Sequence, residues 1–280
     1  MTLTRRIDLT KTRGKDARLL LGREWLVTNG LGGYASGTIS GCENWRYHGL
    51  LIAALPAPFG RQVMLNHVSE YLVCADGTRH QIGGEEPALP ENGQEVGHYL
   101  TEFRLENGLP VWRYQIGEIK LEKRVLFLYG QNTVHLSYWL LSDQEQVRLE
   151  LRPAIHFRGH EQPVDHTAVE DYRLEVTGEH YEITAPNMLP RLRMVMRGDQ
   201  ARFTYDGGSR REIFYQKEAD RGYASRGTLW SPGCFSIQLH PQRSATLIAS
   251  TEWWSIMLAL RPEEALGFYH DRHRMLIDKA

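Results

Sequence analysis

The sequence is poor in cysteine, has no long apolar run and carries no excess of charge of either sign. Its three cysteines, Cys42, Cys74 and Cys234, are an odd number without a Cys-x-x-Cys pair, so they predict neither a disulfide framework nor a thiolate zinc site. Free thiols are typical of the cytoplasm, where we expect the protein. No run reaches the roughly eighteen apolar residues of a membrane helix, and no apolar export segment follows Arg5 and Arg6.

The charge balance argues against polyanionic partners. Lys plus Arg number 33 and Asp plus Glu number 34, which leaves a formal charge of -1. Nothing electrostatic therefore favours a nucleic acid or an anionic membrane, and a neutral polymer is a better partner. With 280 residues, of which 41% are hydrophobic, the chain is long enough for one large all-β domain or two smaller ones.

Alternation of apolar and polar residues is the dominant pattern. It predicts strands at 119–127, 134–140 and 147–151, a strand pair around the turn at 177–180, and a late pair formed by 235–239 and 245–248. Strands at this density favour a mainly β fold, a large antiparallel sandwich. The turn-rich or polar segments 83–97, 158–167 and 216–227 are predicted to be long loops.

The last residues of the sequence predict a helix, whereas the preceding part predicts strands. Pro262, Glu263 and Glu264 make a good first helical turn, so we expect a helix over 262–277. Its apolar residues are available to face inward; they are Leu266, Tyr269, Met275 and Leu276.

The segment from Glu24 to Leu50 concentrates glycine among polar and aromatic residues. Asn29-Gly30 between apolar runs predicts a hairpin with a type I′ turn. More glycines follow in the expected return strand, where glycine marks a bulge or the close approach of a backbone or ligand; they are Gly32, Gly33, Gly37 and Gly41.

A dinucleotide-binding turn is the competing interpretation, because Gly30, Gly32 and Ala35 fit a G-x-G-x-x-G/A spacing. That motif needs a helix directly afterwards and an acidic residue about twenty positions on. The sequence instead continues with β-favouring residues and has no such acid, which argues against a nucleotide.

Polar and aromatic residues meet where the next strand is expected. The apolar run 49–54 predicts a strand covered on both faces, and the preceding Trp45-Arg46-Tyr47-His48 is expected to start it. On a strand, Arg46 and His48 would point to one side and Trp45 and Tyr47 to the other. The structural alternative is that Arg46 pairs with a core carboxylate and His48 caps a backbone carbonyl.

These motifs resemble the N-terminal domain of the bacterial and archaeal type of glycogen debranching enzyme, the amylo-α-1,6-glucosidase family. The resemblance rests on EWLVTNGLGGYASGT, on RYHGLLIAA, on Leu151-Arg152-Pro153 with Arg158 and His160, and on the segment 229–233. One departure is Trp45-Arg46, where the family usually has two arginines before the tyrosine.

The resemblance implies a supersandwich-like glucan-recognition domain at 1–260 and a helical segment at 261–280. That segment would lead to a C-terminal α/α barrel with the catalytic carboxylates. Trp45, Tyr34, Tyr47 and Trp230 would stack on sugar faces of glycogen or a maltooligosaccharide. Asn29, Arg46 and His48 would donate to hydroxyls, with backbone amides near Gly32 and Gly33, and Arg158 and His160 would make polar loop contacts. The same groups are also suited to face the barrel.

No catalytic residue, cofactor or metal site is predicted. Several acids are of the type that glycoside hydrolysis needs, but no pair is singled out; they are Glu24, Glu43, Glu102, Glu161, Asp165 and Glu252. His156, His160 and His166 lack a metal-binding spacing and are expected to serve as loop donors.

Two other hypotheses remain open. One is a free-standing sugar-converting enzyme similar to aldose epimerases, in which a glutamate and a histidine move the anomeric proton. His48 is the candidate for the histidine of this pair. The other is a purely structural module whose exposed faces pack on a barrel or a second copy.

Overall fold

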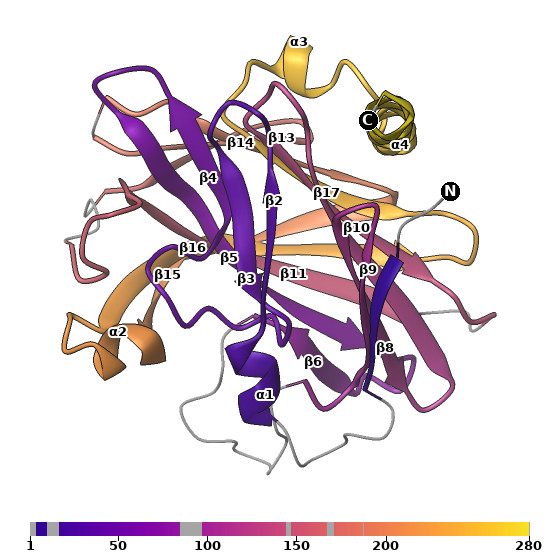
Figure 1. Ribbon diagram of the computed structural model, residues 1–280. Coiled ribbons are helices and arrows are strands. Elements are labelled where there is room, and N and C mark those ends of the chain that lie inside the picture. Colours follow the sequence, from indigo (N-terminus) through magenta and orange to yellow (C-terminus); the bar gives the residue numbers. More distant parts are fainter. Residues whose placement is uncertain are drawn as a thin grey trace.

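The protein is built from two large antiparallel sheets and few helices, as the sequence predicts (Figure 1). The computed structural model describes residues 4–9, 17–84, 97–143, 147–166, 171–186 and 188–279. The strands are β1 (Thr4–Asp8), β2 (Glu24–Thr28), β3 (Tyr34–Thr38), β4 (Gly49–Leu55), β5 (Gly60–Val73), β6 (Arg79–Gly83), β7 (Leu100–Glu106), β8 (Leu109–Ile116), β9 (Ile119–Phe127), β10 (Thr133–Leu140), β11 (Val147–Gly159), β12 (Arg173–Thr177), β13 (His180–Thr184), β14 (Leu192–Arg197), β15 (Asp199–Phe214), β16 (Arg226–Leu239) and β17 (Ala245–Ser250). The helices are α1 (Ala17–Gly22), α2 (Gln216–Asp220), α3 (Trp254–Met257) and α4 (Pro262–Asp278).

The strands are divided between a sheet of nine and a sheet of eight. The first, sheet A, has the order β1-β7-β8-β9-β10-β17-β14-β13-β12. The second, sheet B, has the order β15-β16-β11-β5-β4-β3-β2, and β6 pairs with β5. Strand β2, which begins the glycine-rich segment, therefore lies at one edge of sheet B.

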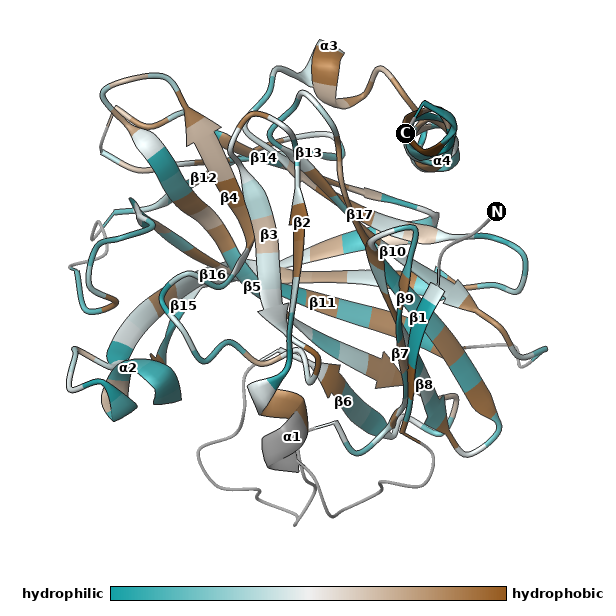
Figure 2. Cartoon of the chain, viewed as in Figure 1, coloured by the Kyte–Doolittle hydropathy of each residue, from teal (hydrophilic) through white to brown (hydrophobic). Residues whose placement is uncertain are grey.

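One apolar core joins the two sheets. Trp25 of β2 meets Trp112 of β8 edge to face, with ring centroids 5.3 Å apart. The alternating pattern explains this packing, because Trp25 and Val27 are buried while the other three residues of β2 are exposed. Figure 2 shows hydrophobic and hydrophilic residues following one another along strands of both sheets.

The hairpin predicted at Asn29-Gly30 is present between β2 and β3, but its predicted type I′ turn is wrong. The strands are joined by five residues, 29–33, and the Asn29 N–H donates to the Gly33 carbonyl at 3.1 Å. Gly30 and Gly32 adopt positive φ angles of 79° and 97°. A strand follows the glycines instead of a helix, as the argument against a nucleotide site requires.

The residues Trp45 to His48 do not start strand β4, contrary to the prediction. They form a turn in which the His48 N–H donates to the Trp45 carbonyl at 3.0 Å, and β4 begins at Gly49. Side chains on a turn do not alternate between two faces, so the predicted separation of these residues into two pairs fails. The strand 49–54 itself is confirmed, and its first five residues are buried.

Two further predictions need correction in the second half of the chain. The segments 235–239 and 245–248 do not pair with each other, because β16 lies in sheet B and β17 in sheet A. The predicted loop 216–227 begins with α2, which packs beside the Trp45–His48 turn. Most of the predicted loop 83–97 lies outside the described residues.

The C-terminal helix begins at Pro262 as predicted and extends to Asp278. Leu266 and Tyr269 pack against the core. Met275 and Leu276, also predicted to face inward, are 56% and 51% exposed, because the last turns of α4 extend past the core cluster. No helix in the described part of the chain has the length and apolar character needed to span a membrane.

Candidate functional site

Six of the eleven predicted site residues line one open hollow at the edge of sheet B. The hollow, here named the β2–β3 hollow, has a volume of about 490 Å³. It lies on the outer side of β2, because the exposed residues of that strand line it. Its lining comprises Glu24, Trp25, Leu26, Thr28, Gly32, Gly33, Tyr34, Ser36, Trp45, Tyr47, His48 and Arg61.

A larger hollow of about 630 Å³ lies elsewhere, where the segment before α4 meets sheet A. Trp139, Arg243 and Pro262 are among its lining residues. None of the site residues predicted from the sequence reaches it. The β2–β3 hollow is therefore the better candidate.

Aromatic rings form one wall of the β2–β3 hollow. The rings of Trp45 and Tyr47 meet edge to face at a centroid distance of 4.8 Å. His160 lies behind them, with its ring 5.8 Å from Tyr47 and 6.4 Å from Tyr34. Tyr34, Trp45 and Tyr47 are half-buried, so each combines a fixed position with some exposed surface.

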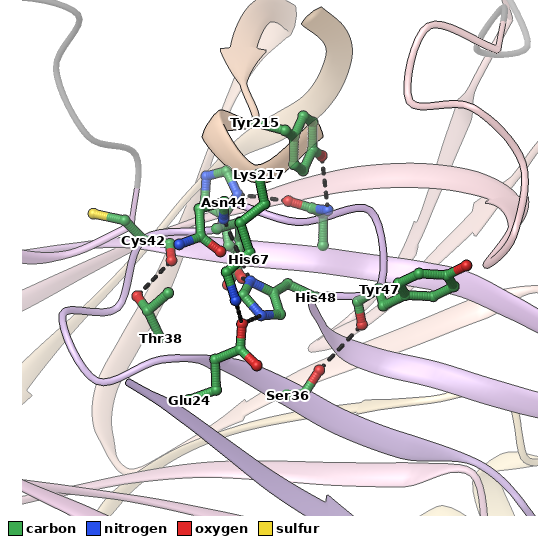
Figure 3. A network of polar contacts seen from close by, with 12 residues as sticks. Glu24, Ser36, Thr38, Cys42, Asn44, Tyr47, His48, His67, Tyr215 and Lys217 are labelled. Carbon is green, nitrogen blue, oxygen red and sulfur yellow. Dashed lines mark hydrogen bonds and ion pairs between the residues drawn. The ribbon is translucent and has the colours of Figure 1, made fainter. Parts of the chain in front are cut away.

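A Glu–His pair forms the polar end of the hollow (Figure 3). The backbone N–H of Asn44 donates to Nδ1 of His48 at 3.3 Å, which leaves the ring proton on Nε2. That Nε2 donates to Oε1 of Glu24 at 3.1 Å. The His48 ring is buried, and loss of solvation lowers its pKa, so the imidazole is neutral at pH 7.

Two donors hold the Glu24 carboxylate. The hydrogen bond from His48 is the largest cause that lowers the pKa of Glu24 to about 2, and a hydrogen bond from Lys217 acts in the same direction. Lys217 belongs to α2 and donates its ammonium to the same oxygen, Oε1. Behind His48, burial raises the pKa of the Glu43 carboxyl well above its usual range, and that carboxyl lies 3.4 Å from Nδ1.

This arrangement is better suited to hydrogen bonding than to proton transfer. A carboxylate with a pKa of about 2 is a weak base. Both ring nitrogens of His48 are engaged within the protein, and its side chain is 2% exposed. The geometry therefore gives the epimerase-like hypothesis little support, whereas a fixed carboxylate is a good acceptor for hydroxyl groups.

Arg46 points away from the hollow toward α2. Its backbone N–H and its Nε donate to the two oxygens of Glu218 at 3.0 and 2.8 Å. Glu218 is fully buried, so the structural alternative considered for Arg46, a pair with a core carboxylate, describes this residue. The pair fixes α2, and with it Lys217, against the Trp45–His48 turn.

Three other predicted residues also make their contacts inside the protein. Asn29 is buried and bonds the hairpin loop to residues 131 and 132. Arg158 is buried and donates to backbone carbonyls of Gly159, His160, Gln162 and Arg46. Trp230 stacks on Tyr172 at 5.1 Å and belongs to the core. None of the three lines the hollow.

The histidines considered as metal ligands do not converge. Nε2 of the buried His156 donates to the backbone carbonyl of His166 at 3.2 Å, while His160 packs on the tyrosines. Within the residues that the structure describes, no group of three or more side chains of metal-ligating type comes together.

Sequence reasoning missed several residues of the hollow. Glu24 was identifiable only as an acid of the right type, although the alternation along β2 places it on the same face as Leu26 and Thr28. Arg61 carries no local signal. Lys217 reaches Glu24 across 193 positions of sequence, a contact that no short motif reveals.

Comparison with known proteins identifies the family. A model of the family described as glycogen debranching enzyme N terminal matches residues 23–246. The chain belongs to this family. The matched range contains every residue of the β2–β3 hollow as well as Lys217 and Glu218, whereas α3 and α4 lie beyond it.

Other comparisons add little to this debranching-type assignment. No curated protein sequence matches the chain significantly. Among solved structures, a bacterial glucoamylase in complex with acarbose is similar at 6% sequence identity and a TM-score of 0.37. The match covers 82% of this chain and 30% of the glucoamylase chain, so the chain spans less than a third of that protein.

Proposed function

We propose that this chain is the substrate-recognition part of a glycogen debranching enzyme. In this proposal the β2–β3 hollow binds a segment of an α-glucan while a C-terminal α/α barrel hydrolyses the α-1,6 branch linkage. The observation that carries it is the composition of the hollow. Half-buried rings of Tyr34, Trp45 and Tyr47 stand beside the fixed carboxylate of Glu24, and binding sites are commonly lined this way.

The partner domain is proposed from the surface of the C-terminal helices. Large apolar side chains are exposed there, including Trp253 at 70% and Phe268 at 62%. Exposed large apolar residues of this kind are suited to pack on another body. We assign this surface to the barrel, and we assign the protein to the cytoplasm, where its three cysteines would stay reduced.

The binding proposal is tested by calorimetric titration of maltoheptaose into the protein, with cellohexaose as the β-linked control. We expect saturable binding of the α-linked sugar only. Tyr47→Ala should weaken it up to about tenfold, since an aromatic contact contributes about 0.5–1.5 kcal/mol. Tyr205→Ala is the matched control, because Tyr205 is exposed on β15 and lies outside the hollow.

Equal heats from both sugars, or none from either, would contradict binding by this chain alone. If binding then appeared in a protein that also contains the barrel, the hollow would be a shared interdomain site.

A further inference from the structure

Glu24 has one carboxylate oxygen that is not used by the protein. Oε1 accepts from His48 and from Lys217, as described above. No residue in the described part of the chain donates to Oε2. The side chain is 32% exposed and lines the hollow, so this oxygen is accessible to a bound molecule.

The position of this carboxylate is fixed before any ligand arrives. His48 is held through Nδ1 by the Asn44 N–H. The backbone N–H of Lys217 donates to the Asn44 carbonyl at 2.9 Å, and its ammonium lies 5.2 Å from the centre of the Trp45 ring. A preset group loses little conformational entropy on binding, which favours affinity and a single ligand orientation.

A cationic donor lies at the other end of β2. Nε of Arg61 donates to the Gly32 carbonyl at 2.7 Å, while its two terminal nitrogens have no acceptor among the described residues. Gly32 lies in the loop that follows β2, four positions after the last strand residue, Thr28, and Glu24 is the first residue of the strand. Five strand residues span roughly 13 Å, so acceptor and donor are separated by more than the length of a single hexose.

We propose that Glu24 orients a neutral oligosaccharide along β2 by accepting hydroxyl groups at one end of the hollow, while Arg61 donates to hydroxyls at the other. The inference rests on the proposed function and specifies the polar groups that recognise the sugar. Hydroxyls both donate and accept, so a hydroxyl-rich chain satisfies both groups, whereas an apolar ligand leaves the carboxylate unpaired. Tyr34 and Tyr47 line the same hollow.

The direct test is Glu24→Gln, which keeps the side-chain shape and removes the charge. We expect maltoheptaose to bind about tenfold or more weakly to this variant at pH 7, because a hydrogen bond to a charged group is lost. The matched control is Glu179→Gln, an exposed carboxylate in the turn between β12 and β13, which should bind like the wild type.

The positioning role of Lys217 is tested by the pH profile of binding. His48 and Lys217 are the titratable groups that face Glu24, with Glu43 behind His48. Because the pKa of Glu24 is about 2, wild-type affinity should stay constant from pH 7 down to pH 4. Lys217→Met removes one donor to Oε1, so the pKa of Glu24 rises and the acid loss of affinity moves to higher pH.

The outcomes separate this inference from the proposed function. If neither the wild-type chain nor a protein that also contains the barrel binds the sugar, the proposed function fails. If the wild type binds and Glu24→Gln binds equally well, Glu24 is not the acceptor, although the proposed function stands. Should Glu24→Gln fail to fold, Arg61→Gln tests the donor at the other end of the hollow: unchanged affinity for maltoheptaose would overturn the inference, and weaker binding would support it.

Discussion

At the scale of single residues, Asn29 organises the loop that carries the glycines of the hollow. Its Oδ1 accepts the N–H groups of Leu31 and Gly33, both at 2.9 Å. Its Nδ2 donates to the Gln131 carbonyl and to Oδ1 of Asn132. One buried side chain thus joins the β2–β3 loop to the loop between β9 and β10. Gly30 is required beside it, because an added Cβ would lie 2.3 Å from the Tyr129 ring.

Replacement of Asn29 by alanine should therefore destabilise the protein strongly. The change leaves two N–H donors and a carbonyl without this partner, while Oδ1 of Asn132 keeps the N–H of Ala54. Buried unsatisfied groups cost about 1–3 kcal/mol each. We expect the free energy of unfolding to fall by roughly 2–4 kcal/mol in urea denaturation. Leu31→Ala, at an exposed position of the same loop, should change it by less than about 0.5 kcal/mol. Equal losses in the two variants would contradict this role of Asn29.

The residue types at the site were predictable, but their individual roles were not. Six of the eleven predicted residues line the hollow; they are Gly32, Gly33, Tyr34, Trp45, Tyr47 and His48. Asn29, Arg46 and Arg158 are polar residues of the kind that binds ligands, yet each meets its hydrogen-bonding needs inside the protein. The difference depends on partners such as Glu218, which lies 172 positions from Arg46 and gives no local signal.

At the scale of elements, the short helix α3 covers part of the outer face of sheet A. Met257 of α3 packs on Val195 and Ile248. His135 of β10 lies directly opposite Ile248 in the neighbouring strand, so it points to the same face. It is 1% exposed, and neither ring nitrogen has a hydrogen-bond partner within the described part of the chain. Burial lowers the pKa of His135 to about 4.

This buried histidine should make stability depend on pH. The neutral form is favoured in the fold, while an unfolded histidine binds a proton near pH 6.5. The stabilisation is complete above pH 6.5 and decreases as the pH falls toward 4, where the loss reaches roughly 3 kcal/mol. His135→Leu should reduce the slope of unfolding free energy against pH by one proton over this window, measured by urea denaturation. Above pH 7 the two curves should run parallel, and an unchanged slope below it would disprove the assignment.

At the scale of the whole molecule, the alternating pattern was sufficient to predict a sandwich but not its strand order. Alternation identifies which residues face a core, and β2 and the first half of β11 follow it, whereas β9 and β10 are buried at nearly every position. It does not say which strand is the neighbour. Leu239 and Ala245 are separated by a short connection that resembles a hairpin, yet β16 continues sheet B and β17 enters the middle of sheet A. That choice depends on long-range pairing with β11 and β10, which local sequence does not encode.

Because both sheets bury their inner faces in one core, we expect the described fold to unfold in one cooperative step. Trp112 of sheet A is the clearest link: it is 1% exposed, it packs on Trp25 of sheet B, and its Nε1 donates to the Ile39 carbonyl at 2.8 Å. Trp112→Ala should lower the free energy of unfolding by about 3–5 kcal/mol. The transitions seen by far-UV circular dichroism and by tryptophan fluorescence should move together, because neither sheet keeps its inner face covered without the other. Phe268→Ala removes a ring that is 62% exposed and should shift both transitions by less than about 0.5 kcal/mol. Two separated transitions in the Trp112 variant would show that the sheets are independent units.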